Sequence, residues 1–132
     1  MIKKQFTLYL ENKPGRLAKL TRMLAGEQVN IEGISVSEST DVGLVQIVPS
    51  NAAKTKNTLR KIGVAYTVQD IALLPLKNEP GALSKVVTRL GKRGININYV
   101  YATACSCKAA GCECLAIISA PDLKAVEEAW QA

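Results

Sequence analysis

Histidine is absent from the 132 residues of this chain, and its absence removes several kinds of chemistry at once. Without an imidazole the chain cannot form a Ser-His-Asp triad, a Cys-His pair or a histidine-ligated metal site. A phosphate-binding loop and an evident acid–base pair are also missing. We therefore expect a protein that is not an enzyme.

Aromatic residues and long apolar runs are scarce as well. Aromatic side chains make up 5% of the chain and apolar residues 48%, so we expect a mostly aliphatic core. No segment reaches about 18 consecutive apolar residues, which argues against a membrane span. The opening MIKKQFTLYLENK lacks a small-residue cleavage site, so the sequence predicts no signal peptide and a cytoplasmic address.

The charge is positive but scattered. The formal net charge is +6 and the isoelectric point about 9.3, with the densest group of cations at residues 54–61. Scattered charge is typical of a solvated surface. Only Tyr99 and Tyr101 could stack on bases in the way that RNA-binding sheets do, so nucleic acid is not the partner that we expect.

The second half of the chain repeats the first. The segment ENKPGRLAKL at 11–20 returns as KNEPGALSKV at 77–86, an offset of 66 residues. The same offset matches Leu24 with Leu90 and Asn30 with Asn96 without a gap. A register held through a strand, a turn, a helix and a second strand indicates two copies of one structural unit.

The first copy reads as βαββαβ. Alternation and apolar runs predict strands at 6–10, from 29, at 42–48 and at 64–70. Helices are expected from Pro14 to about Gly26 and at about 50–62, the latter with Ala53, Leu59 and Ile62 on its inner face. This order is the ferredoxin-like plan, an antiparallel sheet with helices on one face.

The second copy stops one strand short of that plan. It predicts strands at 71–76, from 95 and at 114–120, with helices ending near Gly94 and spanning 121–132. The fold class is therefore α+β, with repeats at 1–70 and 71–132. Either the second sheet lacks an edge, or a strand from elsewhere covers it. Each repeat is small enough to need a neighbour, so we expect the repeats to pack together and the chain to form a homodimer.

The repeated turn is suited to binding an anion. With Pro14 as the first helical residue, the helix would leave free N–H donors at Gly15 and Arg16, and likewise at Gly81 and Ala82. The helix dipole favours a carboxylate there. Asn12 and Asn78 add amides before the turn, and Asn30 and Asn96 could accept from an ammonium group. Micromolar affinity needs about −8 kcal/mol, so such a site has to be enclosed.

These residues carry a resemblance to a known family. ENKPGRLAKLTRMLAGEQVNIEGISV resembles an ACT domain, through N-x-P-G-x-L, a helix and V/I-N-I at the second strand, and both copies show the pattern. The resemblance implies a βαββαβ fold, side-by-side pairing of domains and an amino-acid effector at an interface between repeats or subunits. In serine-binding members, asparagines at the positions of Asn12 and Asn30, or of Asn78 and Asn96, contact the ligand.

The resemblance implies a stand-alone tandem regulator with a small amino acid as effector and a regulated enzyme as partner. Pro-Gly could instead serve only to start a helix. If a single copy binds, we favour the first, because Arg16 adds charge that Ala82 cannot. The expected ligand-binding set is Asn12, Pro14, Gly15, Arg16, Leu17, Asn30, Ile31, Asn78, Gly81, Ala82 and Asn96.

All four cysteines fall in CSCKAAGCEC at 105–114. A hairpin with KAAG as its turn would place Cys107 opposite Cys112 and Cys105 opposite Cys114, with every thiol on one face. Four thiolates could hold zinc or copper(I), whereas unliganded thiols and redox pairing remain alternatives. The alternative function is therefore a metal or redox sensor, and no other cofactor is expected.

Overall fold

The computed structural model describes residues 1–38, 42–103 and 113–131. The chain forms two compact units. The N-terminal unit is Lys4–Gln69, and the C-terminal unit combines Met1–Lys3 with Asp70–Ala132. These units are defined by packing in the structure. The repeat boundaries at 1–70 and 71–132 were predicted from the sequence and remain a prediction.

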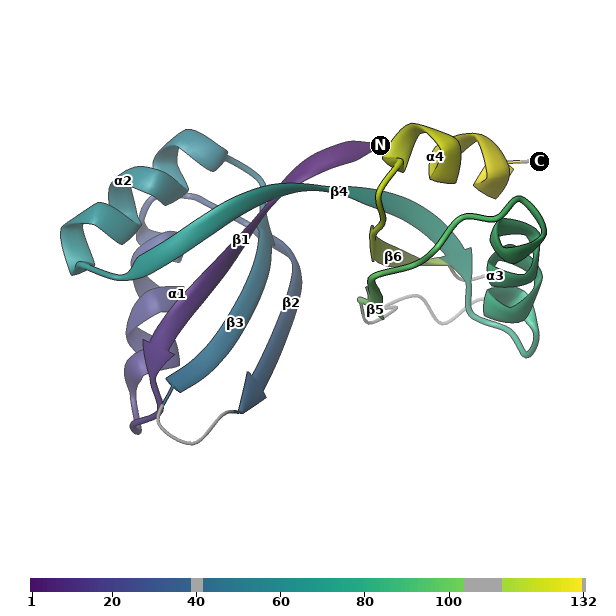
Figure 1. Cartoon of the computed structure of the whole chain (residues 1–132). Helices are drawn as coiled ribbons and strands as arrows, with labels where there is room; N and C mark the ends of the chain where they lie inside the picture. The colour runs from purple at the N-terminus through teal and green to yellow at the C-terminus, as the bar shows by residue number, and fades with distance from the viewer. Residues whose placement is uncertain (39–41, 104–112, 132) are drawn as a thin grey trace. The chain divides into compact units, whose positions relative to one another are not determined.

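The N-terminal unit is an antiparallel sheet with two helices on one face (Figure 1). Its strands lie in the order β2-β3-β1-β4. In the register of the sheet, Leu8 and Val36 are both opposite Val45. The elements are β1 (Ile2–Glu11), α1 (Arg16–Gly26), β2 (Ile31–Glu38), β3 (Val42–Pro49), α2 (Ala52–Ile62) and the beginning of β4 (Ala65–Lys77).

Alternation along β1 builds the core of this unit. Phe6, Leu8 and Leu10 point to one side and are buried against Leu20 and Leu24 of α1. Successive side chains of a strand face opposite sides, so the residues between them lie on the other face.

Helix α2 contributes Leu59 to the same core, as expected. Our prediction for Ala53 was wrong: it is exposed, whereas Ala52 packs against the core and Thr55 is fully buried. With 3.6 residues per turn, Ala52 lies seven residues before Leu59 and therefore on the same face, whereas Ala53 is turned about 100° away from it. The helix begins at Ala52, after Asn51 accepts a capping hydrogen bond from the Lys54 amide at 3.0 Å.

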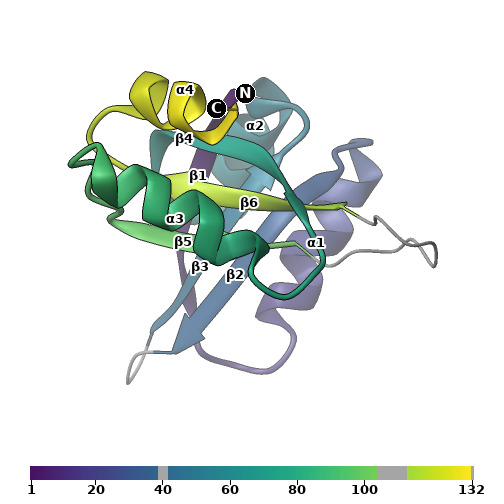
Figure 2. The same ribbon diagram turned by 90° about the vertical axis from the view of Figure 1, so that its right-hand side faces the viewer.

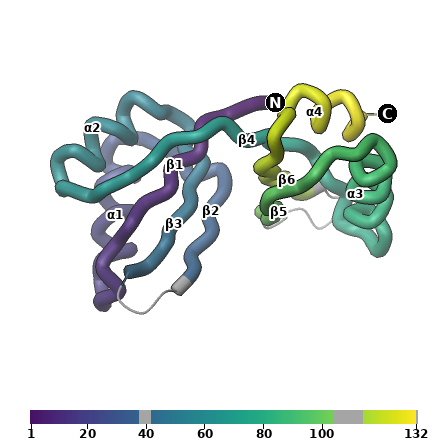
Figure 3. The backbone as a smooth tube through the Cα atoms, viewed as in Figure 1, coloured from purple at the N-terminus to yellow at the C-terminus, as the bar shows by residue number. Residues whose placement is uncertain are grey.

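Strand β4 joins the two repeats without a turn. We predicted separate strands at 64–70 and 71–76, but the structure has a single strand, Ala65–Lys77, which the tube in Figure 3 follows without a break. The boundary reads VQDIAL and contains no glycine, proline or asparagine to reverse the chain. The two predicted strands are therefore halves of one element.

The C-terminal unit has the same plan. Helices α3 (Ala82–Lys92) and α4 (Leu123–Gln131) cover one face of a sheet that includes β5 (Tyr99–Ala102) and β6 (Glu113–Ser119), as Figure 2 shows. Strand β5 begins at Tyr99 rather than at 95 as predicted. The core contains Ala72, Leu74, Leu90, Ala116, Ile118, Val126, Ala129 and Trp130.

The missing strand of the second repeat is supplied by the start of the chain. The Leu73 amide donates to the Met1 carbonyl at 2.7 Å, and the Met1 ammonium donates to the Leu73 carbonyl at 3.2 Å. The same ammonium lies 2.8 Å from a carboxylate oxygen of Glu127 on α4. Of the two alternatives left open by the sequence, the structure shows the second: a strand from elsewhere covers the edge of β4.

The described helices have 9 to 11 residues. Within the described ranges, none of them has both the length and the apolar character that crossing a membrane would require.

Candidate functional site

The repeated turn starts its helix later than predicted. Helix α1 begins at Arg16, and Gly15 precedes it in the left-handed region with a φ of 84°. Gly81 has a φ of 85° before α3. Pro14 is therefore not the first helical residue, because the glycine after it reverses the chain with a conformation that costs other residues about 1–2 kcal/mol.

This shift changes which amides are free. The Arg16 amide donates to the Lys13 carbonyl at 3.3 Å, and the Ala82 amide donates to the Glu79 carbonyl at 3.2 Å. The predicted free donors at Arg16 and Ala82 were therefore wrong.

The donors lie one residue further along each helix. Within the described residues, the amides of Leu17 and Ala18 have no acceptor, and the same holds for Leu83 and Ser84. Neither helix start has a side-chain cap. Two adjacent N–H groups at the positive end of each helix are thus available to an anion.

Charged side chains surround the first turn. One carboxylate oxygen of Glu11 lies 3.1 Å from Lys13 Nζ and 3.4 Å from Arg16 Nη2. The hydrogen bond and positive charge of Lys13, followed by the charge of Arg16, hold the pKa of Glu11 below its usual value. A carboxylate that binds Arg16 must therefore share or displace Glu11.

Removing Lys13 should raise the pKa of Glu11 toward its usual value, and Lys13→Ala should do so more than Arg16→Ala because Lys13 is the larger cause. The interaction is complete at neutral pH and is lost as the pH falls through the lowered pKa. Carbon-detected NMR titration of the Glu11 carboxyl group measures the effect. Lys19→Ala is the control on the same helix, and an unchanged Glu11 titration in Lys13→Ala would contradict the assignment.

Three of the predicted residues come together beside this turn. A cavity of about 200 Å³ is lined by Leu10, Glu11, Asn12, Lys13, Arg16, Leu17, Val36, Gly43 and Val45. Asn12 also lines an adjoining cavity of about 240 Å³ with Val36, Ser37 and Gly43. The predicted site residues Asn12, Arg16 and Leu17 therefore line one cavity together with Val36 near the end of β2. The sequence motif did not indicate that β2 takes part in the site.

Asn30 and Ile31 lie at the other end of the same sheet. Ile31 is opposite Pro49, whereas Glu11 is opposite Val42, so the length of β3 separates them. Seven residue steps at roughly 3.3 Å amount to about 23 Å. The Asn30 amide donates to Ser50 Oγ at 2.8 Å, which holds it at that end. One unit cannot place Asn12 and Asn30 on one amino acid.

The second copy shows the same separation and a different turn. Asn78 follows β4 directly, whereas Asn96 precedes β5, and its Nδ2 donates to Asn98 Oδ1 at 3.3 Å. The positions of Glu11, Lys13 and Arg16 are taken by Lys77, Glu79 and Ala82. The second turn therefore lacks the arginine, and its neighbouring charges are reversed.

Only Cys114 of the four predicted metal ligands is among the described residues. Cys105, Cys107 and Cys112 lie outside the described residues, whereas Cys114 lies on β6 opposite Leu76 and is disulfide-bonded. No group of three potential metal ligands occurs in the part of the chain that the structure describes. The metal site stays a prediction. It requires Cys114 in the reduced form, because the thiolate is the ligand.

Comparison with known proteins decides the family. The model of the ACT domain pair matches residues 1–111, which is more than half of the chain. The chain belongs to the ACT domain pair family. The sequence resemblance is thereby confirmed over both repeats. Among curated proteins, none matches this ACT domain pair.

Solved structures share the fold of this ACT domain pair. A protein from Bacteroides thetaiotaomicron is 29% identical with a TM-score of 0.85, covering 99% of this chain and 88% of that one. The ligand-free regulatory subunit of aspartate kinase from Thermus thermophilus is 16% identical with a TM-score of 0.71, covering 97% and 90%. The corresponding Thermus flavus subunit is 17% identical with a TM-score of 0.67, covering 99% and 94%.

Proposed function

We propose that this ACT domain pair is a non-enzymatic regulatory protein that binds a small amino acid between two copies of the chain. The observation that carries the proposal is the open edge of β2 beside the Asn12 cavity. Among the strands that the structure describes, β2 is the last of the sheet in the N-terminal unit and pairs with β3 only. An unpaired strand edge is a template for a further strand.

Exposed apolar side chains accompany this edge. Ile34 is 42% exposed and Val36 54%, and Leu17 of α1 is 38% exposed. Ile34 and Val36 are opposite the buried Ile47 and Val45, so they point to the side of the sheet that carries the helices. Contiguous exposed apolar residues along an open strand are typical of an interaction surface. A second copy that pairs antiparallel along β2 would cover them.

Antiparallel pairing of two copies would also bring Asn12 of one copy close to Asn30 of the other. It brings the beginning of one β2 beside the end of the other, where the Asn12 cavity lies. The partner's Asn30 would then approach Asn12 across the seam. The two side chains that one unit holds about 23 Å apart could reach one ligand.

The proposed ligand contacts follow from the chemistry of the turn. The carboxylate of the amino acid accepts from the amides of Leu17 and Ala18 and from Arg16. The ammonium group donates to Asn12 and to the partner's Asn30. Hydrogen bonds to charged groups contribute about 1.5–3 kcal/mol each, and a partly buried carboxylate gains up to about 2 kcal/mol from the helix dipole. A second copy that covers the site would exclude water, and these hydrogen bonds and the helix-dipole interaction would then be stronger than at an exposed surface.

A role in controlling an enzyme accords with the regulatory subunits that share this fold. We therefore include a regulated enzyme as the downstream partner of the proposed sensor. The amino acid would act on it through the dimer, because binding at the seam favours the paired state by mass action.

Calorimetry with the common amino acids tests the proposal. We expect one amino acid to bind, and Asn12→Ala and Asn30→Ala each to weaken binding by about tenfold or more, since each removes a hydrogen bond to a charged group. Asn78→Ala and Asn96→Ala are the matched controls from the second repeat. Sedimentation should show that the ligand favours the dimer. No heat and no thermal shift at millimolar ligand would refute the proposal.

A further inference from the structure

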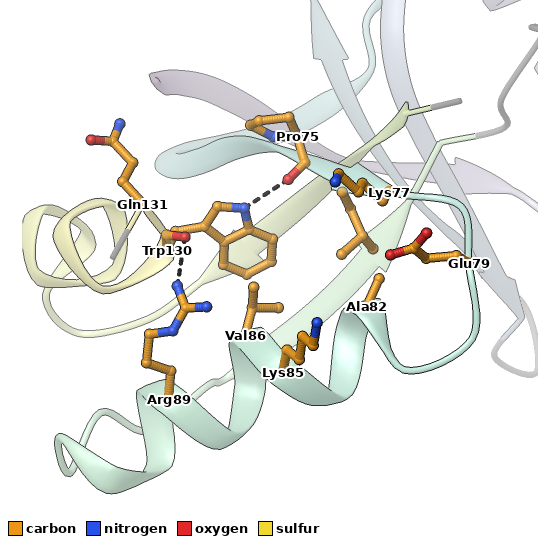
Figure 4. Close-up of a pocket in the computed structure, with 10 residues that line it drawn as sticks. Pro75, Lys77, Glu79, Ala82, Lys85, Val86, Arg89, Trp130 and Gln131 are labelled. Atoms are coloured by element: carbon orange, nitrogen blue, oxygen red, sulfur yellow. Dashed lines mark hydrogen bonds between the residues drawn. The ribbon is translucent and has the colours of Figure 1, made fainter. Parts of the chain in front are cut away.

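The C-terminal unit contains a second cavity that the proposed sensor site does not use. It measures about 330 Å³ and lies among the end of β4, the first turns of α3 and the end of α4 (Figure 4). Of the predicted ligand-binding residues only Ala82 lines it. A volume of this size is at the lower end of what small-molecule sites offer.

One wall of the cavity is apolar and held in place. The indole of Trp130 lies beside Val86, and its Nε1 donates to the Pro75 carbonyl at 2.7 Å (Figure 4). This hydrogen bond satisfies the only polar atom of the indole and fixes the ring. Leu76 and Ala82 extend the wall, so the cavity offers a rigid surface for an apolar group.

The other side of the cavity is positively charged. Lys77, Lys85 and Arg89 line it, against the single carboxylate of Glu79. Arg89 Nη1 donates to the carbonyls of Ala129 and Trp130, both at 2.9 Å, so this guanidinium is engaged at the end of α4. Within the described residues the side-chain ammonium groups of Lys77 and Lys85 have no hydrogen-bond or ion-pair partner, whereas the Lys85 backbone amide donates to the Gly81 carbonyl at 3.0 Å. Two ammonium groups therefore remain available to a ligand.

The corresponding position in the first repeat has a smaller cavity. The corresponding cavity in the N-terminal unit is about 130 Å³ and is lined by Tyr9, Leu10, Glu11, Arg16, Ile62, Gly63 and Val64. There Glu11 and Arg16 form an ion pair at 3.4 Å. At an offset of 66 they become Lys77 and Ala82, so the second repeat has lost the arginine side chain and reversed the charge.

We propose that this cavity binds a small organic anion, a carboxylate with a branched aliphatic or aryl body. The body rests on Trp130, Val86 and Leu76, and the carboxylate lies between Lys77 and Lys85. An anion is favoured over a zwitterion, because Lys77, Lys85 and Arg89 outnumber the one carboxylate of Glu79 among the lining residues. The site therefore differs in chemistry from the amino-acid site at the seam and does not depend on it.

The only tryptophan of the chain makes the test direct. Trp130 fluorescence should change saturably on titration with 4-methylpentanoate or phenylacetate. The neutral amides 4-methylpentanamide and phenylacetamide should bind about tenfold more weakly or not at all, because they lack the charge that the lysines attract. Lys77→Gln combined with Lys85→Gln should weaken carboxylate binding by a similar factor.

Two further variants control this experiment. Lys19→Gln changes the residue that corresponds to Lys85 in the first repeat and should bind as the unaltered protein does. Ala82→Leu adds bulk to the apolar wall without changing the charge and should weaken binding by narrowing the cavity.

No saturable change at millimolar carboxylate would overturn the proposal, as would equal binding of acid and amide or unaltered binding by the double lysine variant. Asn12→Ala should bind the probes normally, so failure here and failure of the seam site are distinguishable.

Discussion

Replacing Leu24 or Leu90 by alanine will lower the free energy of unfolding by about 2–5 kcal/mol, the largest effect that we expect from single substitutions in this chain. Both side chains are 0% exposed. They occupy equivalent positions in the two repeats, and each lies in the core of its own unit. Removing either one leaves a cavity that a close-packed core cannot fill completely.

Urea unfolding measures these losses, and Trp130 fluorescence reports on the C-terminal unit. Leu17→Ala and Leu83→Ala are the matched controls on the same two helices, because these leucines are 38% and 43% exposed. We expect them to cost less than about 1 kcal/mol, since little buried area is lost. Equal costs at Leu17 and Leu24 would contradict the helix orientation described above.

Deleting Met1–Lys3 will destabilise the C-terminal unit by about 2 kcal/mol. The deletion removes the two backbone hydrogen bonds between Met1 and Leu73, each worth about 1 kcal/mol, and leaves the edge of β4 uncovered. Hydrogen exchange resolves the effect by residue. The Leu73 amide should exchange faster, whereas amides in the middle of β1 and β3 should keep their protection.

The Glu127→Ala variant distinguishes the contribution of the backbone hydrogen bonds of Met1 from that of its ammonium charge. Glu127→Ala removes the ion pair with the Met1 ammonium, 2.8 Å long, and keeps the backbone hydrogen bonds. Because this ammonium is well exposed, we expect a loss of less than about 1 kcal/mol. Undiminished protection of Leu73 after the deletion would show that the chain start does not act as the fourth strand.

Local structure could be predicted where the residues themselves decide it. The alternation at 6–10 predicted a strand there, and this strand is the second half of β1, Ile2–Glu11. Its alternate residues Phe6, Leu8 and Leu10 are buried. The spacing of Leu17, Leu20, Thr21 and Leu24 predicted one apolar face of α1. Leu20 and Leu24 are buried as expected, whereas Leu17 is 38% exposed. Pro14 was misplaced because a proline that fits the first helical turn fits the preceding turn equally well, and the left-handed Gly15 decided between them.

The candidate site was predictable in part for the same reason. Asn12, Arg16 and Leu17 are close in sequence, so any conformation of the turn keeps them near each other. Asn30 was grouped with them on the chemistry of its amide and on the resemblance, and the path of α1 carries it to the opposite end of the sheet. In our proposal a second copy completes the site, and the sequence indicated such pairing only through the small size of each repeat and the resemblance.

By itself the sequence determined the duplicated α+β plan and most of its strands and helices, because periodicity and turn chemistry act over a few residues. Its repeated motif also carried the resemblance to the ACT domain, which the family model confirmed. Only the tertiary structure decided that Met1 covers the edge of β4 and that Ala82 leaves a cavity beside Trp130. Both depend on segments more than 45 residues apart in the sequence. Contacts of that kind are selected by packing and by the need to pair every strand edge, which local propensity does not contain.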